Sequence, residues 1–248
     1  MKIKNVLISQ PKPASEKSPY YDIANKYGVK IDFHPFIKVV SIPAQEFRQQ
    51  KISILDHTAV IFTSRHSIDH FFTLCEELRI TVPETMKYFC NSEAIALYIQ
   101  KYVQYRKRKI FFGKTGKFEG LLPTIIKNKK EKFIIPVSDV HNSDIKTHLD
   151  QHNIALTEAV MYRTVSNDMN GKNVSDYDLV IFFSPAGIVS LKEQFPDFKQ
   201  EKVCIGTFGA STAQTVVDAG LRLDLEAPTP AAPSMTAALE EFIKENNK

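Results

Sequence analysis

One short pattern, present twice, constrains this chain more than any other feature. It is an apolar run that ends in a polar turn and continues into an amphipathic segment. One copy is Asp178-Leu-Val-Ile-Phe-Phe-Ser-Pro-Ala-Gly187, and the other is Thr58-Ala-Val-Ile-Phe-Thr-Ser-Arg65. A short, wholly apolar run of this kind is typical of a buried parallel strand. The polar turn then lies at the carboxyl end of the strand, where open α/β sheets bind their ligands.

The spacing between the two copies recurs elsewhere in the chain. Val60 and Val180 are 120 residues apart. Phe89-Cys-Asn-Ser-Glu-Ala-Ile-Ala96 corresponds to Phe208-Gly-Ala-Ser-Thr-Ala-Gln-Thr215 at an offset of 119. An ordered series of matches at nearly constant spacing indicates two related α/β units, each of domain size.

Two extended segments, residues 37–42 and 155–166, bracket the middle of the chain. Strands alternate with helices on either side of them, which favours mostly parallel sheets. We therefore expect two α/β domains with flavodoxin-like, mostly parallel sheets, joined by a two-stranded linker made of these segments. The first domain is discontinuous and comprises residues 1–36 and 167–248. The second comprises residues 43–154.

The composition is that of a globular protein. An apolar content of 43% in 248 residues is ordinary and can fill two cores. No apolar run is long enough to span a bilayer, and the N-terminal segment lacks the apolar stretch of a signal peptide. The three cysteines, Cys75, Cys90 and Cys204, lie scattered in apolar patterns, so we expect reduced core residues of a cytoplasmic protein with no membrane partner.

The net charge of +4 allows an anionic ligand without requiring a nucleic acid. Two basic clusters, Arg106–Lys109 and Lys127–Lys132, each precede a predicted strand, at the end of the sheet opposite the expected site. We interpret them as solvated edges and expect no nucleic-acid partner. Nucleic-acid binding through these clusters stays open as the weakest alternative.

Gly113-Lys-Thr-Gly-Lys117 looks at first like a phosphate-binding loop. Such a loop needs four residues between its glycines and a Ser or Thr after the Lys. Here two residues separate the glycines and Phe118 follows. The segment is therefore predicted to be an ordinary turn.

Two histidine pairs have a spacing that can chelate zinc, His66 with His70 and His148 with His152. A third ligand is missing near each pair, and the pairs fall in different predicted helices. We therefore expect exposed helical histidines and no bound metal.

Polar residues stand at several predicted junctions between a strand and the following helix. Each can be a simple helix N-cap. Together they would line the carboxyl edges of two sheets with hydroxyls and free helix N-termini, a surface that suits carboxylates or phosphates. The candidate ligand-binding residues are Thr63, Ser64, Arg65, Ser92, Ser138, Ser184, Gly209, Ser211 and Thr212.

Tyr162 lies on the second extended segment. A tyrosine there is usually a packing residue, but beside a ligand cleft it can donate a proton. No Ser-His-Asp or Cys-His set and no carboxylate pair is visible in the chain.

The order and spacing of these segments resemble the uroporphyrinogen-III synthase family over nearly the whole chain. The resemblance rests on Val60-Ile-Phe-Thr-Ser64, Asn91-Ser-Glu-Ala94, Ala159-Val-Met-Tyr-Arg-Thr-Val165, Val180-Ile-Phe-Phe-Ser-Pro-Ala-Gly187, Phe208-Gly-Ala-Ser-Thr-Ala213, Ala219-Gly-Leu221 and Ala227-Pro-Thr-Pro230.

The resemblance implies two α/β domains on a two-stranded linker and a reaction without metal or organic cofactor. It implies the substrate hydroxymethylbilane, a linear tetrapyrrole with eight carboxylates. This substrate loses its hydroxyl and closes into a ring with the last pyrrole inverted. Tyr162 aligns with the family tyrosine proposed to protonate the leaving hydroxyl, and the polar rim would hold the carboxylates. Gln10-Pro11 replaces the Arg-Pro that many members carry after the first strand.

We expect the chain to act as a monomer. The main alternative to the cyclising enzyme is a non-catalytic two-domain binding protein for an anionic small molecule or a tetrapyrrole. The absence of a strong catalytic constellation in the sequence leaves this alternative open.

Overall fold

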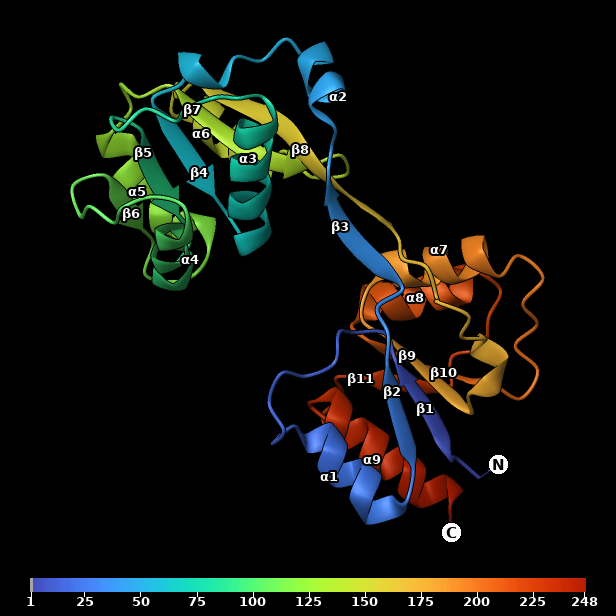
Figure 1. Cartoon of the computed structure of the whole chain (residues 1–248). Coiled ribbons are helices and arrows are strands. Elements are labelled where there is room, and N and C mark those ends of the chain that lie inside the picture. The colour runs from blue at the N-terminus through green and yellow to red at the C-terminus, as the bar shows by residue number, and fades with distance from the viewer. Residues whose placement is uncertain (1) are drawn as a thin grey trace. The chain divides into compact units, whose positions relative to one another are not determined.

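The computed structural model describes residues 2–248, which form two compact units (Figure 1). The chain up to Lys38 and Val165–Lys248 make up one of them, here called the terminal unit. Val39–Thr164 make up the other, the central unit. Within residues 2–248, no helix has the length and apolar character that crossing a membrane requires.

The terminal unit contains a parallel five-stranded sheet in the order β11-β10-β9-β1-β2. Numbered along this unit, the order is 2-1-3-4-5, so the strand order reverses between β1 and β9. The elements are β1 (Asn5–Ile8), α1 (Pro19–Tyr27), β2 (Lys30–Phe33), η3 (Val174–Asp176), β9 (Leu179–Phe182), α7 (Pro185–Gln194), β10 (Cys204–Phe208), α8 (Ala210–Asp218), β11 (Leu225–Ala227) and α9 (Met235–Asn246).

Helices cover both faces of this sheet, so its middle strands are buried on two sides. A strand buried on both faces must be apolar at every position, which explains the continuous apolar run of β9. Its alternate residues point to opposite faces. Leu179 and Ile181 lie in one core with residues of α1 and α9, whereas Val180 and Phe182 lie in another with residues of α7 and α8.

The central unit contains a six-stranded sheet in the order β3-β8-β7-β4-β5-β6. Strands β4 to β8 pair in parallel. Numbered from β4, they have the order 3-2-1-4-5 when read from the β6 edge, so the reversal lies between β4 and β7. The elements are β3 (Ile37–Ser41), α2 (Ala44–Gln49), η1 (Ile54–Asp56), β4 (Ala59–Phe62), α3 (Arg65–Glu77), β5 (Lys87–Cys90), α4 (Glu93–Tyr98), η2 (Ile99–Lys101), β6 (Ile110–Phe112), α5 (Phe118–Lys127), β7 (Phe133–Ser138), α6 (Asp144–Gln151) and β8 (Leu156–Ser166).

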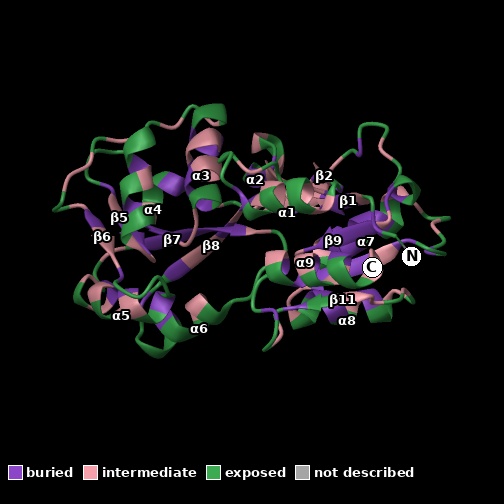
Figure 2. Cartoon of the chain, turned by 90° about the horizontal axis from the view of Figure 1, so that it is seen from below, coloured by how far each residue is buried: buried purple, intermediate pink, exposed green. Residues whose placement is uncertain are grey.

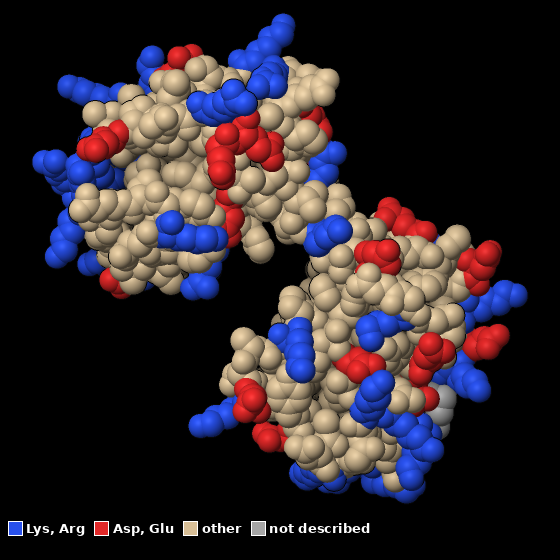
Figure 3. All heavy atoms as spheres, in the orientation of Figure 1, with Lys and Arg blue, Asp and Glu red and all other residues tan. Residues whose placement is uncertain are grey.

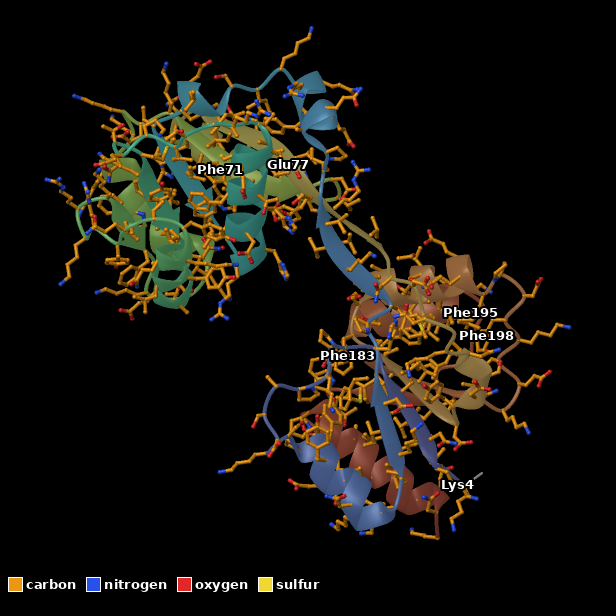
Figure 4. The ribbon with its side chains drawn as sticks, viewed as in Figure 1. Lys4, Phe71, Glu77, Phe183, Phe195 and Phe198 are labelled. Atoms are coloured by element: carbon orange, nitrogen blue, oxygen red, sulfur yellow. The ribbon has the colours of Figure 1, made fainter. Side chains whose placement is uncertain are left out.

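The core of the central unit is also split between the two faces of its sheet. Val60 and Phe62 lie in one core with Phe71 of α3, which is labelled in Figure 4. Ala59 and Ile61 lie in the other, with residues of α5 and α6. Figure 2 shows the result in each unit: the middle strands, such as β4 and β9, are buried, and the helices are exposed on their outer faces. The predicted class, α/β with mostly parallel sheets, is confirmed.

Two elements are shorter than the sequence pattern predicts. The spacing of Phe47, Ile52 and Leu55 predicts a helix over residues 44–55, but α2 ends at Gln49 because Lys51 has a φ of 55°, a left-handed conformation that stops a helix. The sequence also predicts a strand over residues 222–225, but β11 begins at Leu225. The side chain of Asp224, just before it, accepts a hydrogen bond from the amide of Ile205.

Strands β3 and β8, the two extended segments predicted from the sequence, are neighbours at one edge of the central sheet. The amide of Ile42 donates to the carbonyl of Met161 at 3.1 Å. The chain passes from the terminal unit to the central unit between Lys38 and Val39. It returns between Thr164 and Val165. That the units are independently folding domains with the predicted bounds stays a prediction.

Candidate functional site

The central unit has a pocket at the carboxyl edge of its sheet, next to the point where the strand order reverses. The pocket has a volume of about 440 Å³. Thr63 follows β4, Asn91 follows β5, Ser138 ends β7 and Tyr162 comes from β8, and all four line it. The sequence predicts such an edge for the ligand, since backbone and side chains of several strands converge there.

Tyr162 is the half-buried aromatic residue of this pocket. Its ring stacks on His70, with 5.1 Å between the ring centroids and 24° between the planes. Burial raises the pKa of the Tyr162 hydroxyl, and the nearby Ser64 side chain partly offsets this effect. The phenol is therefore protonated at neutral pH and can donate a proton.

Thr63 and Asn91 bring unused polar atoms to the pocket. The hydroxyl of Thr63 makes no hydrogen bond to any residue that the structure describes. The side-chain oxygen of Asn91 is buried and also has no partner among the described residues. A buried polar atom without a partner is costly, and a ligand that donates to it removes that cost. Asn91 directly follows a predicted strand, at one of the polar strand-to-helix junctions that the sequence indicates.

Ser64 and Ser92 both cap helices. Ser64 begins α3, and its side chain accepts from the amide of Ser67 at 3.1 Å. The side chain of Ser67 accepts in turn from the amide of Ser64 at 3.2 Å, which completes a capping box. Ser92 begins α4 and accepts from the amide of Ile95 at 3.4 Å. These two hydroxyls are already engaged in helix capping.

Arg65 and Ser138 occupy different surroundings. Arg65 is exposed, and its guanidinium carbon lies 5.2 Å from the centre of the Tyr98 ring. Ser138 is half-buried and donates to Asp139 at 3.0 Å. Both residues lie at the same edge of the sheet as the pocket, but only Ser138 lines it.

One carboxylate also lines the pocket. Glu158 of β8 accepts from the Ser143 hydroxyl at 3.1 Å, and the Nε2 atom of His141 lies 3.7 Å from its other oxygen. The Glu158 carboxylate is thus engaged by neighbouring residues of the same unit.

The terminal unit carries the other candidates at the carboxyl ends of β9 and β10. Ser184 begins α7 and is half-buried, and its side chain makes no capping bond. Phe183, labelled in Figure 4, precedes it and has its ring 6.1 Å from that of Phe208. Gly209 begins α8 with a φ of 96°, a conformation that favours glycine. The first turn of this helix therefore has no side-chain cap.

The hydroxyls of Ser211 and Thr212, both in the first turn of α8, differ in access. Ser211 is exposed. Thr212 is only 1% exposed, and its amide donates to the carbonyl of Gly209 at 3.1 Å. Ser211 can therefore meet a ligand from solvent, whereas Thr212 is covered by protein.

All four histidines of the two pairs were expected to be exposed, but one of them is not. His148 and His152 are exposed, but His70 is half-buried and its Nδ1 atom lies 2.6 Å from the hydroxyl of Ser41. Packing of α3 beside β3 and β8 covers it, which a helical periodicity alone does not show. Within residues 2–248, no group of three or more His, Cys, Asp or Glu is arranged to hold a metal ion.

The two basic clusters are largely solvated. Lys107, Arg108, Lys129 and Lys130 are exposed. Figure 3 shows Lys and Arg side chains at many places on both units, interspersed with Asp and Glu. No single basic face stands out in that view.

Comparisons of the sequence and of the fold with known proteins point to a single enzyme family. It matches the family described as Uroporphyrinogen-III synthase HemD over residues 19–237. A search of curated protein sequences gave no significant match. Its fold is similar to that of uroporphyrinogen-III synthetase from Helicobacter pylori 26695, with a TM-score of 0.58 and 17% identity over 98% of this chain and 100% of that one.

A second similar structure is a mutant uroporphyrinogen III synthase from the extremely thermophilic bacterium Thermus thermophilus. The TM-score is 0.50, with 13% identity over 97% of this chain and 98% of that one. At such identities the structural likeness concerns the fold alone, whereas the family match spans most of the sequence. The chain therefore belongs to the uroporphyrinogen-III synthase family.

Proposed function

We propose that this chain is a cyclising lyase of tetrapyrrole biosynthesis that converts hydroxymethylbilane into uroporphyrinogen III, with inversion of the last pyrrole ring and loss of water. Family membership supports the reaction. The observation that carries the assignment of the site is the pocket at the reversal of the central sheet. It places the half-buried Tyr162 beside unused polar atoms of Thr63 and Asn91.

Tyr162 is proposed as the proton donor. When the substrate's C–O bond breaks, a proton from the phenol lets the hydroxyl leave as water. The raised pKa of Tyr162 keeps the phenol protonated before this step and makes the resulting phenolate a strong base, which takes back the proton that the pyrrole releases when the ring closes. The reaction needs no redox change, and we propose that neither a metal nor an organic cofactor takes part.

Eight substrate carboxylates require many donors, and we propose candidate donors within each unit. In the central unit Thr63, Arg65 and Ser138 are the available side chains, with smaller contributions from Ser64 and Ser92 because these hydroxyls already cap helices. In the terminal unit Ser184, Gly209 and Ser211 surround two helix N-termini, whose amides and dipoles favour anions. Thr212 is proposed to support α8 from within.

Selectivity is proposed to come from how the site folds the linear substrate. Spontaneous closure gives the uninverted isomer, so the enzyme must hold the chain in the conformation that leads to inversion. We further propose that the protein acts as a monomer and without nucleic acid.

The test is a turnover assay on hydroxymethylbilane. The product is oxidised, and isomers III and I are counted by chromatography against a reaction without protein. Isomer III should dominate only when protein is present. An isomer ratio equal to that of the blank would contradict the proposal, and retention of unchanged tetrapyrrole would indicate a binding protein.

Tyr162→Phe tests the assignment of the proton donor. It removes one hydroxyl and keeps the ring, so we expect kcat to fall about 10²-fold, the low end for a lost general acid, with little change in melting temperature. Tyr20→Phe is the matched control, because burial raises the pKa of Tyr20 to about 12 although it belongs to α1 and does not line the pocket. Equal kcat values for the two variants would show that the proton comes from elsewhere.

A further inference from the structure

His70 is held from two sides within the central unit. It lies on α3, one helical turn after His66. Its Nδ1 atom lies 2.6 Å from the hydroxyl of Ser41 on β3, and its ring stacks on Tyr162 of β8 at 5.1 Å. Three elements that are far apart in the sequence therefore meet at this imidazole.

The contacts of His70 restrict the orientation of the Tyr162 ring. The planes of the two rings are 24° apart, so the imidazole covers a face of the phenol ring. The bond to Ser41 fixes the imidazole, since a ring with one nitrogen bonded cannot rotate without breaking that bond. Tyr162 is thus restrained at its ring by His70.

His70 does not line the pocket, whereas Tyr162 does. Any effect of His70 on the reaction must therefore pass through Tyr162. Burial, and secondarily the neighbouring His66, lower the pKa of His70, while Asp69 acts in the opposite direction. The imidazole is accordingly neutral at pH 7 and stacks as an uncharged ring.

We propose that His70, fixed by Ser41, is a positioning residue that holds the Tyr162 phenol in the orientation required for proton donation. The inference rests on the proposed function, because it gives Tyr162 the role of the proton donor. A reacting group must be held within a fraction of an ångström, and side chains locked by neighbouring packing achieve this.

A double-mutant cycle separates this role from a contribution to folding. The four proteins are wild type, His70→Ala, Tyr162→Phe and the double variant. His70→Ala should lower kcat on the order of tenfold in the wild-type background, since misplacement by about 1 Å costs up to about 10²-fold, and should leave KM nearly unchanged. In the Tyr162→Phe background the same change should have no further effect. Independent, additive losses would overturn the proposal.

Two conservative variants identify which property of His70 matters. His70→Phe keeps a ring for stacking and should retain kcat within about threefold of wild type, whereas His70→Gln can still bond Ser41 but has no ring and should match His70→Ala. His152→Ala, at an exposed position in the same unit, is the control and should leave kcat unchanged. Wild-type kcat in His70→Gln would contradict the proposal. These variants also keep the test usable if His70→Ala folds poorly.

A measurement without substrate distinguishes failure of this inference from failure of the proposed function. With labelled tyrosine, the ring resonances of Tyr162 are assigned in the NMR spectrum by their loss in Tyr162→Phe. They should shift in His70→Gln and stay near their wild-type positions in His152→Ala. Unmoved resonances in His70→Gln would refute the positioning role whatever the turnover assay shows. Shifted resonances with no wild-type turnover would refute only the proposed function.

Discussion

Ser64 and Ser184 occupy the same place in two copies of one sequence pattern, but their hydroxyls have different uses. Each follows a buried strand and begins a helix with nearly the same extended backbone, φ −153° and ψ 167° for Ser64 and φ −155° and ψ 150° for Ser184. Ser64 takes part in a capping box. The hydroxyl of Ser184 makes no hydrogen bond within the part of the chain that the structure describes.

The residue three positions later accounts for the difference. In the central unit it is Ser67, which bonds back to Ser64. In the terminal unit it is Gly187, where a β-carbon would lie 3.1 Å from a ring carbon of Phe182. The close approach of α7 to Phe182 thus leaves no room at position 187 for a side chain that could bond Ser184. The comparison teaches that one strand-to-helix pattern can serve helix stability in one unit and leave a hydroxyl free for a ligand in the other.

The largest predicted effect tests whether the two units are separate domains. Phe62 and Phe182 are both 0% exposed, at matching places in the two cores. Phe62→Ala and Phe182→Ala should each lower the free energy of unfolding by about 3–5 kcal/mol, through lost contacts and the cavity left behind. Limited proteolysis with mass spectrometry should find the first cleavages within 39–164 for Phe62→Ala and outside that range for Phe182→Ala. Identical cleavage sites would show one cooperative unit.

The capping box predicts a smaller effect, confined to stability. Ser67→Ala removes the hydroxyl that bonds the backbone of Ser64, and should lower the free energy of unfolding by about 1 kcal/mol, or about 2–4 °C in melting temperature. Ser211→Ala, at an exposed position of α8, is the control and should change stability by less than about 0.5 kcal/mol. Equal losses in both variants would mean that the capping box contributes nothing of its own.

Ser184→Ala should leave stability unchanged and weaken substrate binding instead. Its hydroxyl has no capping bond to lose, so melting temperature should be unchanged. If it binds a substrate carboxylate, KM should rise about fivefold at nearly constant kcat. A fivefold change corresponds to about 1 kcal/mol of binding free energy, a modest loss because several donors share the carboxylates. Steady-state kinetics on hydroxymethylbilane with parallel thermal melts provide the measurement. A fall in melting temperature without a change in KM would make Ser184 a cap like Ser64.

The smallest predicted effect is the pH dependence of stability in the central unit. Burial lowers the pKa of His70 below its ordinary value of 6.5, so the unfolded chain binds a proton more readily than the folded one. Stability from this group is therefore complete above pH 6.5 and is lost as the pH falls from there through the folded-state pKa. Wild-type melting temperature should drop more between about pH 7.5 and about pH 5 than that of His70→Phe. Parallel curves for the two proteins would disprove the linkage.

Much of the fold could be predicted from the sequence, because it depends on interactions between residues that are neighbours in the chain. Ser18-Pro19 and Gly28 are start and stop signals of a helix in the sequence, and they bound α1, with Gly28 in the left-handed conformation at φ 63°. The apolar runs at 59–62 and 179–182 are buried strands as predicted. These features depend on neighbouring residues only, through backbone sterics, capping and the need of a doubly covered strand to be apolar.

By itself, the sequence thus determined the α/β class, the pattern of strands and helices and the family. The tertiary structure alone decided the two strand orders, which hydroxyls cap helices, and the surroundings of Asn91 and His70. The contact of His70 with Ser41 and Tyr162 joins residues 29 and 92 positions away along the chain. Such contacts are set by how helices pack on sheets, and that packing depends on the shapes of whole cores rather than on any short stretch of sequence.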